Sequence, residues 1–462
     1  MEHLPAGPIQ ALRRRRQNRR ASPTRLIVVS FLAVIGAGTL LLMMPVSTPA
    51  GITPLDALFT ATSATCVTGL VVRDTYQGFT AFGQGVILCL IQVGGLGLVT
   101  LTSFFALALH RRMSFRSIQL AGESVNASSL GDARGLLMNV MKLAALFEGL
   151  GALLLLPAFV PAFGAEGVFI AVFLSVSAFC NAGFDILGRA AAYSSLVVYA
   201  SNAYVQAVIM VLIVAGGLGF VVWAELGRWP RTRHLSLHTR VVLAFTAVLL
   251  VGGTVGFAFL EWSNPATLGG MSVGDKLLNS LFQSVSARTA GFNTVDLAGM
   301  NTITKCMMCL LMFIGAAPGG TGGGIKVTTF SVLLVTVACV AAGREDAVIF
   351  RRRLGKKTVY RSLAIAVLSM FAVTLATLFV FFNTDASCSP LDSLFESVSA
   401  FATVGLSVGV TASMEPLAKV ITAVTMFIGR VGPVSLAISL AVRPRRREGR
   451  FDVLPEGKLT VG

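Results

Sequence analysis

A short apolar segment that recurs four times constrains the fold of this chain more than any other feature. Each copy ends in Ser-Ala, a few further residues and a glycine, and the closing glycines lie roughly 110 residues apart. The copies are LFTATSATCVTGL (58–70), VFLSVSAFCNAGF (172–184), LFQSVSARTAGF (281–292) and LFESVSAFATVGL (394–406). This near-even period indicates one unit present four times, and four similar units can surround one axis.

Composition indicates the environment of these units. Hydrophobic residues make up 55% of the 462 residues and charged residues only 13%. Apolar runs of about 20 residues, long enough to cross a bilayer as helices, recur along the chain. We therefore predict an all-α polytopic membrane protein. The expected spans are 26–44, 82–109, 136–160, 204–226, 241–260, 363–382 and 418–442, and an eighth, near 302–340, is interrupted.

The recurring segments differ from these spans because each offers only about ten helix-compatible residues, too few to cross a bilayer. They are interpreted as re-entrant helices followed by extended loops. Non-helical backbone is tolerated at membrane depth only where it is buried in protein or lines a water-filled cavity. We therefore expect four pseudo-symmetric helix/pore-loop/helix repeats around a central pore. The expected boundaries are a basic amino terminus (1–25), repeats at 26–110, 111–235, 236–342 and 343–442, and a tail (443–462).

The distribution of charge predicts the orientation. The formal net charge is +16, and the basic residues cluster at the amino terminus and after each second helix of a repeat. By the positive-inside rule these clusters are cytoplasmic, which places both termini inside and the re-entrant loops outside a cell (inner or plasma) membrane. Their regular placement favours topology over nucleic-acid binding. The clusters are Arg13–Arg16 with Arg19, Arg20 and Arg25; Arg111, Arg112 and Arg116; Arg228, Arg231 and Arg233; Arg344, Arg351–Arg353, Lys356 and Lys357; and Arg443 with Arg445–Arg447.

The four loops have the residue types of an ion filter. A cation that enters a narrow pore must shed water, and backbone carbonyls can replace that water. Glycine permits the backbone angles that aim a carbonyl at the axis and has no side chain to block the path. The last copy contains the Thr-Val-Gly core of the potassium-channel filter, and the other copies are degenerate. The predicted K+ ligands are Thr403, Val404 and Gly405; Val67, Thr68 and Gly69; Asn181, Ala182 and Gly183; and Thr289, Ala290 and Gly291.

The interrupted eighth span contains a run of glycines, from Gly315 to Gly324, around Pro318. Proline removes a backbone donor, and each glycine weakens a helix by about 1 kcal/mol relative to alanine, so we expect a flexible segment in the middle of the membrane. Its unpaired backbone groups are expected to face pore water. The alternative is a tight kink for close helix packing. A phosphate-binding loop is less favoured than either, because Ile325 separates Gly324 from Lys326 and breaks the Walker pattern.

Arg430 lies near the middle of the last expected span, where an isolated arginine costs about 2.5 to 3.5 kcal/mol on the insertion scale. A buried ion pair or a set of carbonyl acceptors would offset that cost. Glu396 and Gln283, in the re-entrant helices, are expected to brace filters or attract cations. Glu148 and Lys142 either pair with each other or contact a dimer partner. Catalysis is not expected, since no nucleophile and base set is visible and the C-x-x-C at Cys306 and Cys309 has no second ligand pair.

The chain resembles the Trk/Ktr/HKT superfamily of potassium transporters, and within it the membrane subunit of bacterial Ktr potassium uptake systems. The stretches that carry the resemblance are Val93–Gly97, Ala287–Thr294, Met312–Thr329, Met426–Pro433 and the tail Leu454–Lys458. The resemblance implies an intramembrane gate below the filter, with Arg430 facing the pore beside it. The implied gate residues are Ala316, Ala317, Pro318, Gly319, Gly320, Thr321, Gly322, Gly323, Gly324, Lys326 and Arg430.

Further expectations follow from the same resemblance. Gly69 favours potassium, because serine at this position is associated with sodium permeation in the superfamily. The implied assembly is a homodimer docked on a cytosolic nucleotide-binding regulatory ring of the KtrA/TrkA type. Potassium is the expected cargo, sodium is a possible second ion, and no bound organic cofactor is expected. Two alternatives stay open: a cation-coupled potassium symporter, and the potassium-binding subunit of a primary pump.

Overall fold

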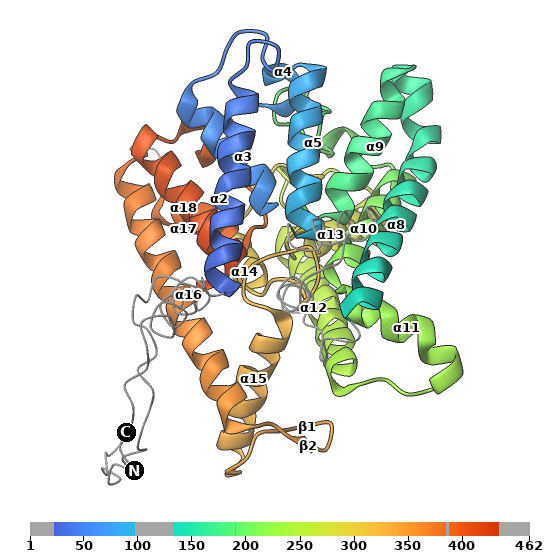
Figure 1. Ribbon diagram of the computed structural model, residues 1–462, viewed down its shortest axis with the longest axis vertical. Coiled ribbons are helices and arrows are strands. Elements are labelled where there is room, and N and C mark those ends of the chain that lie inside the picture. Colours follow the sequence, from blue (N-terminus) through green and yellow to red (C-terminus); the bar gives the residue numbers. More distant parts are fainter. Residues whose placement is uncertain (1–22, 98–132, 190, 385–387, 434–462) are drawn as a thin grey trace, which may run out of the picture.

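The computed structural model describes residues 23–97, 133–189, 191–384 and 388–433, which form a mostly helical bundle. Long helices stand around the outside, and short helices and loops fill the middle (Figure 1). The α-helices are α2 (Pro23–Leu42), α3 (Pro54–Cys66), α4 (Thr75–Gly78), α5 (Ala81–Leu96), α8 (Ala133–Phe163), α9 (Glu166–Phe179), α10 (Ala203–Gly217), α11 (Phe220–Thr232), α12 (Leu237–Glu261), α13 (Val273–Ser286), α14 (Thr302–Phe313), α15 (Val327–Ala341), α16 (Lys356–Phe382), α17 (Pro390–Ala402) and α18 (Pro416–Val431).

The remaining regular elements are small. Two short 3-10 helices, η1 (Val197–Tyr199) and η2 (Val410–Ser413), lie in loops. Strands β1 (Val348–Ile349) and β2 (Arg352–Arg353) form an antiparallel hairpin between α15 and α16.

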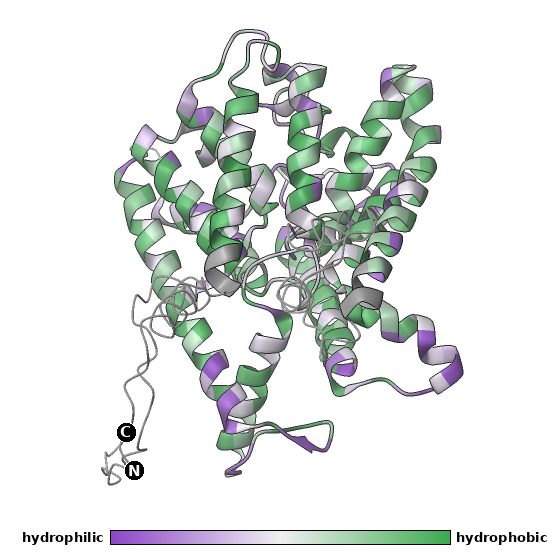
Figure 2. Ribbon diagram, viewed as in Figure 1, coloured by the Kyte–Doolittle hydropathy of each residue, from purple (hydrophilic) through white to green (hydrophobic). Residues whose placement is uncertain are grey.

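The long helices have the apolar exterior of a membrane protein. Within the described ranges α8, α12 and α16 are long and apolar enough to cross a membrane, and α10 with α11 would add a fourth if they count as one bent span. Large apolar side chains on these helices point outward: Phe259 is 83% exposed and Phe382 is 76% exposed. Figure 2 shows apolar residues along the helices and polar residues near their ends. A surface of this kind is suited to contact with lipid.

Four short helices, α3, α9, α13 and α17, correspond to the recurring apolar segments and have 13 or 14 residues each. Local sequence defines where three of them begin. The hydroxyls of Thr53, Ser272 and Ser389 cap α3, α13 and α17 by accepting from a backbone N–H three residues later. The shared phenylalanine of each segment is fully buried and anchors the helix in the core, at Phe59, Phe173, Phe282 and Phe395.

The short helices pack against other helices in a cyclic order. α5 contacts α9, α10 contacts α13, α14 contacts α17, and α18 contacts α3. In the first three pairs the helix that follows one recurring segment contacts the next segment along the chain. The last pair joins the end of the described chain to its beginning, so the contacts close into a ring.

The helix that follows each recurring segment stops early. α5, α10 and α18 are each followed, within two residues, by a glycine with positive φ, at Gly97, Gly219 and Gly432. The sequence predicts a break only near 302–340, where α14 and α15 are indeed separate helices. The span expected at 204–226 is not one straight helix, because α10 and α11 meet at 98°. The later parts of the spans expected at 82–109 and 418–442 lie outside the described residues.

The described basic clusters are exposed near the lower side of the view in Figures 1 and 2. Arg228, Arg231 and Arg233 belong to the end of α11, and Arg351–Arg353 belong to the β1–β2 hairpin and its turn. The clusters at 13–20, 111–116 and 443–447 lie outside the described residues.

Candidate functional site

Each short helix ends in the same three-residue backbone pattern, at the residues predicted to form the filter. The first residue of the three is left-handed, with φ of 58° at Val67, 58° at Asn181, 74° at Thr289 and 51° at Thr403. The third is a glycine with positive φ, from 69° to 92°. Left-handed geometry is costly for a β-branched residue such as valine or threonine and persists only where surrounding contacts enforce it.

The enforcing contacts come from one serine in each segment: Ser63, Ser177, Ser286 and Ser399. In all four segments the backbone carbonyl of this serine accepts from the N–H of the middle filter residue, at 2.8 or 2.9 Å. Its side chain adds a second bond. In the first and fourth segments the hydroxyl accepts from the N–H of the filter glycine at 3.1 Å. In the second and third it donates to the carbonyl that follows that glycine. These bonds fix the loop that leaves each short helix.

The four glycines meet in one closed ring. A Cβ built on Gly69 would collide with the Ala182 carbonyl, one on Gly183 with Ala290, one on Gly291 with Val404, and one on Gly405 with Thr68. The backbone of each segment therefore packs against the glycine of its neighbour, in chain order around the ring. No L-residue fits at these positions without displacing the adjacent carbonyl, so both the φ angles and the packing require glycine.

A cavity of about 300 Å³ opens on one side of this ring. All four filter glycines line it, together with the carboxylates Asp185 and Asp296. Asp185 accepts from the Leu187 N–H at 3.0 Å. Burial, and to a lesser extent the nearby Asp74 carboxylate, raise the pKa of Asp185 to about 6. Above this pH the cavity contains negative charge directly outside the glycine ring.

The segment between α14 and α15, residues 314–326, passes close to the first residues of three filter segments. The Gly323 N–H donates to Thr403 Oγ1 at 3.1 Å. The side-chain amide of Asn181 lies 3.2 Å from both Thr321 Oγ1 and Thr289 Oγ1. A Cβ on Gly322 would collide with the Thr289 hydroxyl. Thr321, Gly322 and Gly323 of the implied gate therefore contact residues of the predicted filter.

Two cationic side chains hold the same segment. Arg430, on α18, donates through its two terminal nitrogens to the carbonyls of Thr321 and Gly94. Lys326 donates to the Gly322 carbonyl at 2.6 Å. Among the described residues neither cation has a salt-bridge partner. Arg430 therefore has carbonyl acceptors and not the alternative of a buried ion pair. One of these carbonyls, that of Thr321, belongs to the gate segment.

The backbone of the segment is less open than expected. Its N–H groups at Ala317 and Thr321 donate to the carbonyls of Gly217 and Gly216, at 3.0 and 3.2 Å. In return, the Phe220 N–H at the start of α11 donates to the Gly319 carbonyl at 3.0 Å. These bonds attach the segment to the corner between α10 and α11. These groups are therefore paired within the protein, and the expectation that unpaired backbone groups face pore water applies only to the rest of the segment.

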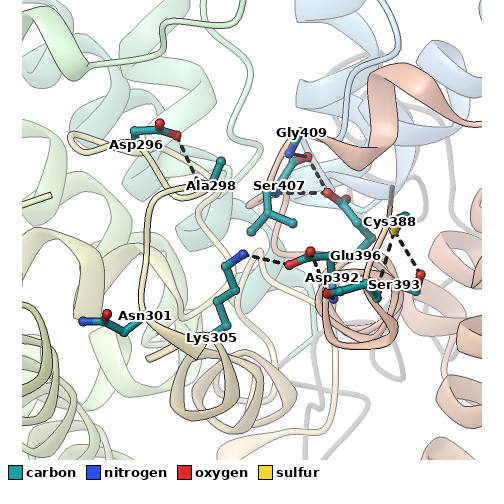
Figure 3. A network of polar contacts seen from close by, with 12 residues as sticks. Asp296, Ala298, Asn301, Lys305, Cys388, Asp392, Ser393, Glu396, Ser407 and Gly409 are labelled. Atoms are coloured by element: carbon teal, nitrogen blue, oxygen red, sulfur yellow. Dashed lines mark hydrogen bonds and ion pairs between the residues drawn. The ribbon is translucent and has the colours of Figure 1, made fainter. Parts of the chain in front are cut away.

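Other polar side chains brace the filter loops from behind. Glu396, fully buried on α17, accepts from the Thr411 hydroxyl at 2.6 Å, the Val408 N–H at 3.0 Å and the Ser407 hydroxyl. Figure 3 shows Glu396 turned toward Ser407, beside the Lys305–Asp392 ion pair. Gln283 has a weaker contact of this kind, with Thr294 Oγ1 at 3.5 Å. Of the two roles considered for Glu396, bracing is the one that these contacts support.

Among the described residues Glu148 does not pair with Lys142, and contact with a dimer partner stays a prediction. Its two carboxylate oxygens each accept from the Gln92 amide at 3.0 Å, and Cys180, beside the second filter segment, lies 3.8 Å away. Lys142 is exposed on the same helix. Cys306 is exposed and Cys309 buried, and among the described residues no group of three or more His, Cys, Asp or Glu side chains could hold a metal ion.

The four serines and the α10–α11 corner are functional features that the sequence predictions miss, although each has a recurring pattern in the sequence. The serine recurs at the same position in all four segments, before Ala. The corner sequence Gly216-Gly217-Leu218-Gly219 repeats Gly94-Gly95-Leu96-Gly97, and Gly219 and Gly97 both have positive φ.

The apolar helices and the central ring of irregular backbone define a mostly helical, multi-span membrane protein. Residues 6–447 match the TrkH family, described as "Cation transport protein". The chain belongs to this family, and is accordingly a transport protein and not an enzyme.

Individual relatives cover nearly the whole chain. It is 39% identical to Ktr system potassium uptake protein B of Bacillus subtilis over 445 residues, which are 96% of this chain and 97% of that protein. It is 40% identical to the protein of the same name from Vibrio alginolyticus, over 97% of both chains. Potassium/sodium uptake protein NtpJ of Enterococcus hirae is 35% identical over 97% of this chain and 99% of its own length.

A solved structure has the same fold. The crystal structure of the potassium transporter TrkH from Vibrio parahaemolyticus superposes with a TM-score of 0.70 at 19% identity, covering 92% of this chain and 86% of that one.

Proposed function

We propose that this chain is the potassium-translocating subunit of a Ktr-type uptake system, with a pore built by four pseudo-symmetric repeats of one chain. The observation that carries the proposal is the closed ring of Gly69, Gly183, Gly291 and Gly405. Each glycine packs against the backbone carbonyl of the middle filter residue of the neighbouring segment. Such a ring can replace the hydration shell of a cation. Two relatives that share nearly the whole chain are named for potassium uptake, which supports potassium as the cargo.

The selectivity filter in this proposal consists of the four three-residue segments, from Val67–Gly69 to Thr403–Gly405. The gate consists of residues 316–324 with Lys326 and Arg430. The contacts of Thr321, Gly322 and Gly323 with filter residues support a gate directly beneath the filter. The two cations would oppose the passage of K+ while the segment is in this position.

The proposal includes the arrangement in the membrane and the assembly. The repeats are 26–110, 111–235, 236–342 and 343–442, with cytoplasmic termini at 1–25 and 443–462. The subunit forms a homodimer on a cytosolic nucleotide-binding regulatory ring. The exposed arginines of α11 and of the β1–β2 hairpin support a basic surface on the side that would face such a ring.

The test compares potassium and sodium flux in proteoliposomes for the wild type, for Gly69→Ser and for a deletion of residues 317–323. We expect potassium-selective flux in the wild type, loss of selectivity in Gly69→Ser because the new side chain collides with the Ala182 carbonyl, and higher flux in the deletion. Absence of cation flux from all three folded proteins, with the regulatory partner present, would contradict the proposal and favour a pump subunit.

Coupled transport is the second candidate, because one relative is named a potassium/sodium uptake protein. Potassium flux measured with and without a sodium gradient separates the two. A channel-like pore gives flux that follows the potassium gradient alone, whereas a symporter accumulates potassium at the expense of the sodium gradient.

A further inference from the structure

The first residues of the filter segments have side-chain oxygens that the gate segment occupies. Asn181, Thr289 and Thr403 hold this position in the second, third and fourth segments, and all three are fully buried. The first segment has Val67 at this position, and its side chain has no oxygen. The inner end of the filter therefore has three polar side chains and one apolar side chain around it.

Each polar side chain is engaged by the gate segment or by a neighbour that contacts it. Thr403 Oγ1 accepts the Gly323 N–H at 3.1 Å. The Asn181 amide lies 3.2 Å from Thr321 Oγ1 and bridges to Thr289 at the same distance. Gly322 packs against the Thr289 hydroxyl so closely that a Cβ would not fit. With the segment docked, an N–H hydrogen points at an oxygen that a cation would need.

We propose that Asn181, Thr289 and Thr403 form an inner site for a monovalent cation whose ligand oxygens are available only when the gate segment undocks. The inference rests on the proposed function, because it assumes that K+ reaches this end of the filter. Hydroxyl and amide oxygens are suitable ligands for a partly dehydrated monovalent cation. Three such oxygens hold it weakly, as conduction requires.

Occupancy of the site and docking of the segment exclude one another for two reasons. The Thr403 oxygen cannot accept the Gly323 N–H and coordinate a cation in the same direction. Arg430 and Lys326, bonded to the carbonyls of Thr321 and Gly322, add positive charge next to the site while the segment is docked. By linkage, potassium must favour the undocked segment by the same factor by which docking weakens potassium binding.

The test uses the purified full-length protein and measures hydrogen exchange of the peptide that contains residues 314–326, at low and at high potassium, with choline as the replacement. We expect potassium to raise exchange of this peptide in the wild type. In Thr403→Val we expect exchange at low potassium to rise about fivefold, the ratio that corresponds to loss of one hydrogen bond, and the potassium dependence to flatten. Thr403→Ser retains the hydroxyl and is expected to restore both properties.

Thr377→Val is the matched control. Thr377 lies on α16, and its hydroxyl donates to the Val373 carbonyl within the same helix at 2.9 Å. The substitution Thr377→Val removes a threonine hydroxyl that lies on another helix and does not hydrogen-bond to residues 314–326. Exchange of the 314–326 peptide is therefore expected to match the wild type.

A parallel measurement of the melting temperature against potassium reports binding independently of the gate. If potassium raises the melting temperature and drives selective flux while exchange of 314–326 stays unchanged in the wild type, the inner site is refuted and the proposed function stands. Equal behaviour of Thr403→Val and Thr403→Ser would also refute it. If potassium produces neither flux nor stabilisation, the proposed function fails and the site fails with it.

Discussion

Single residues hold the filter in a backbone conformation that is unfavourable on its own. Val67 and Thr403 have φ of 58° and 51°, a region that costs β-branched residues of the order of 1–3 kcal/mol. Ser63 and Ser399 offset this cost through one backbone and one side-chain hydrogen bond each. In the proposed filter, the serine of the recurring Ser-Ala is thus as necessary to the loop geometry as the glycine that closes each segment.

Removal of one of these hydroxyls should therefore affect selectivity. We predict that Ser399→Ala leaves the Gly405 N–H without its partner, lowers the free energy of unfolding by about 1–2 kcal/mol and reduces the ratio of potassium to sodium flux. The measurements are thermal unfolding in detergent and flux in proteoliposomes. Ser413→Ala, at the exposed end of η2, removes a hydroxyl whose only bond among the described residues is to the Val410 carbonyl within the same turn, and as the control it should leave both unchanged. Unaltered selectivity in a stable Ser399→Ala protein would exclude this role.

Asp185 is expected to make the cavity beside the glycine ring sensitive to pH. Its pKa is raised to about 6 by burial, with a contribution from Asp74. The carboxylate is charged above that pH and neutral below it, so attraction of cations should decline as the external pH falls from 7.5 to 5. We expect potassium flux at low ionic strength to fall by about twofold, whereas Asp185→Asn should be lower at pH 7.5 and flat over this range. An identical pH profile in wild type and variant would disprove the assignment.

At the scale of elements, the short helices could be predicted and the breaks after them could not. The segments of α3, α13 and α17 are too short to span a membrane, which predicts short helices. The capping residues Thr53, Ser272 and Ser389 mark where these helices begin. The corner between α10 and α11 depends on the positive φ of Gly219 and on its bonds to residues 317–321, about 100 residues away in the chain. An apolar run alone does not indicate such a distant partner. The repeated Gly-Gly-Leu-Gly motif does mark the position of the break.

The same limit applies to the gate segment. Its glycines predict a break in the helix, but the pairing of its N–H groups with Gly216 and Gly217 depends on the tertiary fold. Arg430 illustrates the point: the sequence shows a costly charge in an apolar helix, and only the structure shows which carbonyls accept from it.

Arg430 links two elements, the gate segment and the end of α5. We predict that Arg430→Gln raises potassium flux in the absence of the regulatory partner by about tenfold, because it removes a positive charge and weakens a charge-assisted bond to the Thr321 carbonyl. Flux in proteoliposomes measures the change. Arg344→Gln, at an exposed position between α15 and the β1–β2 hairpin, is the control. A closed, folded Arg430→Gln protein would show that the arginine does not hold the gate.

At the scale of the whole molecule, the ring of helix contacts is closed by residues from opposite ends of the chain. Lys419, on α18, pairs with Asp56, on α3, at 2.8 Å, and both side chains are mostly buried. Lys305 on α14 and Asp392 on α17 form an equivalent pair at 2.8 Å within the ring. The fourfold period of the sequence predicts four units around an axis, but not which side chains join them.

We predict that Lys419→Met lowers the free energy of unfolding by about 1–3 kcal/mol, because among the described residues it leaves Arg73, at 3.4 Å, as the remaining ion-pair partner of Asp56. Thermal unfolding in detergent measures the loss. Arg189→Met, which removes a more exposed ion pair with Glu166, should change stability by less than about 0.5 kcal/mol. Equal effects of the two substitutions would show that closure of the ring does not depend on this pair.

The corner between α10 and α11 also affects how the pathway can open. In the proposed function, the barrier beneath the filter is a single segment, and its backbone is hydrogen-bonded to this corner on one side of the ring. Opening by symmetric widening of the pore would require all four units to move outward together. A flap that is hinged at its two helix ends, α14 and α15, and released from one side can open while the other three units keep their positions. We therefore expect the filter to retain its ion preference whether the flap is open or closed.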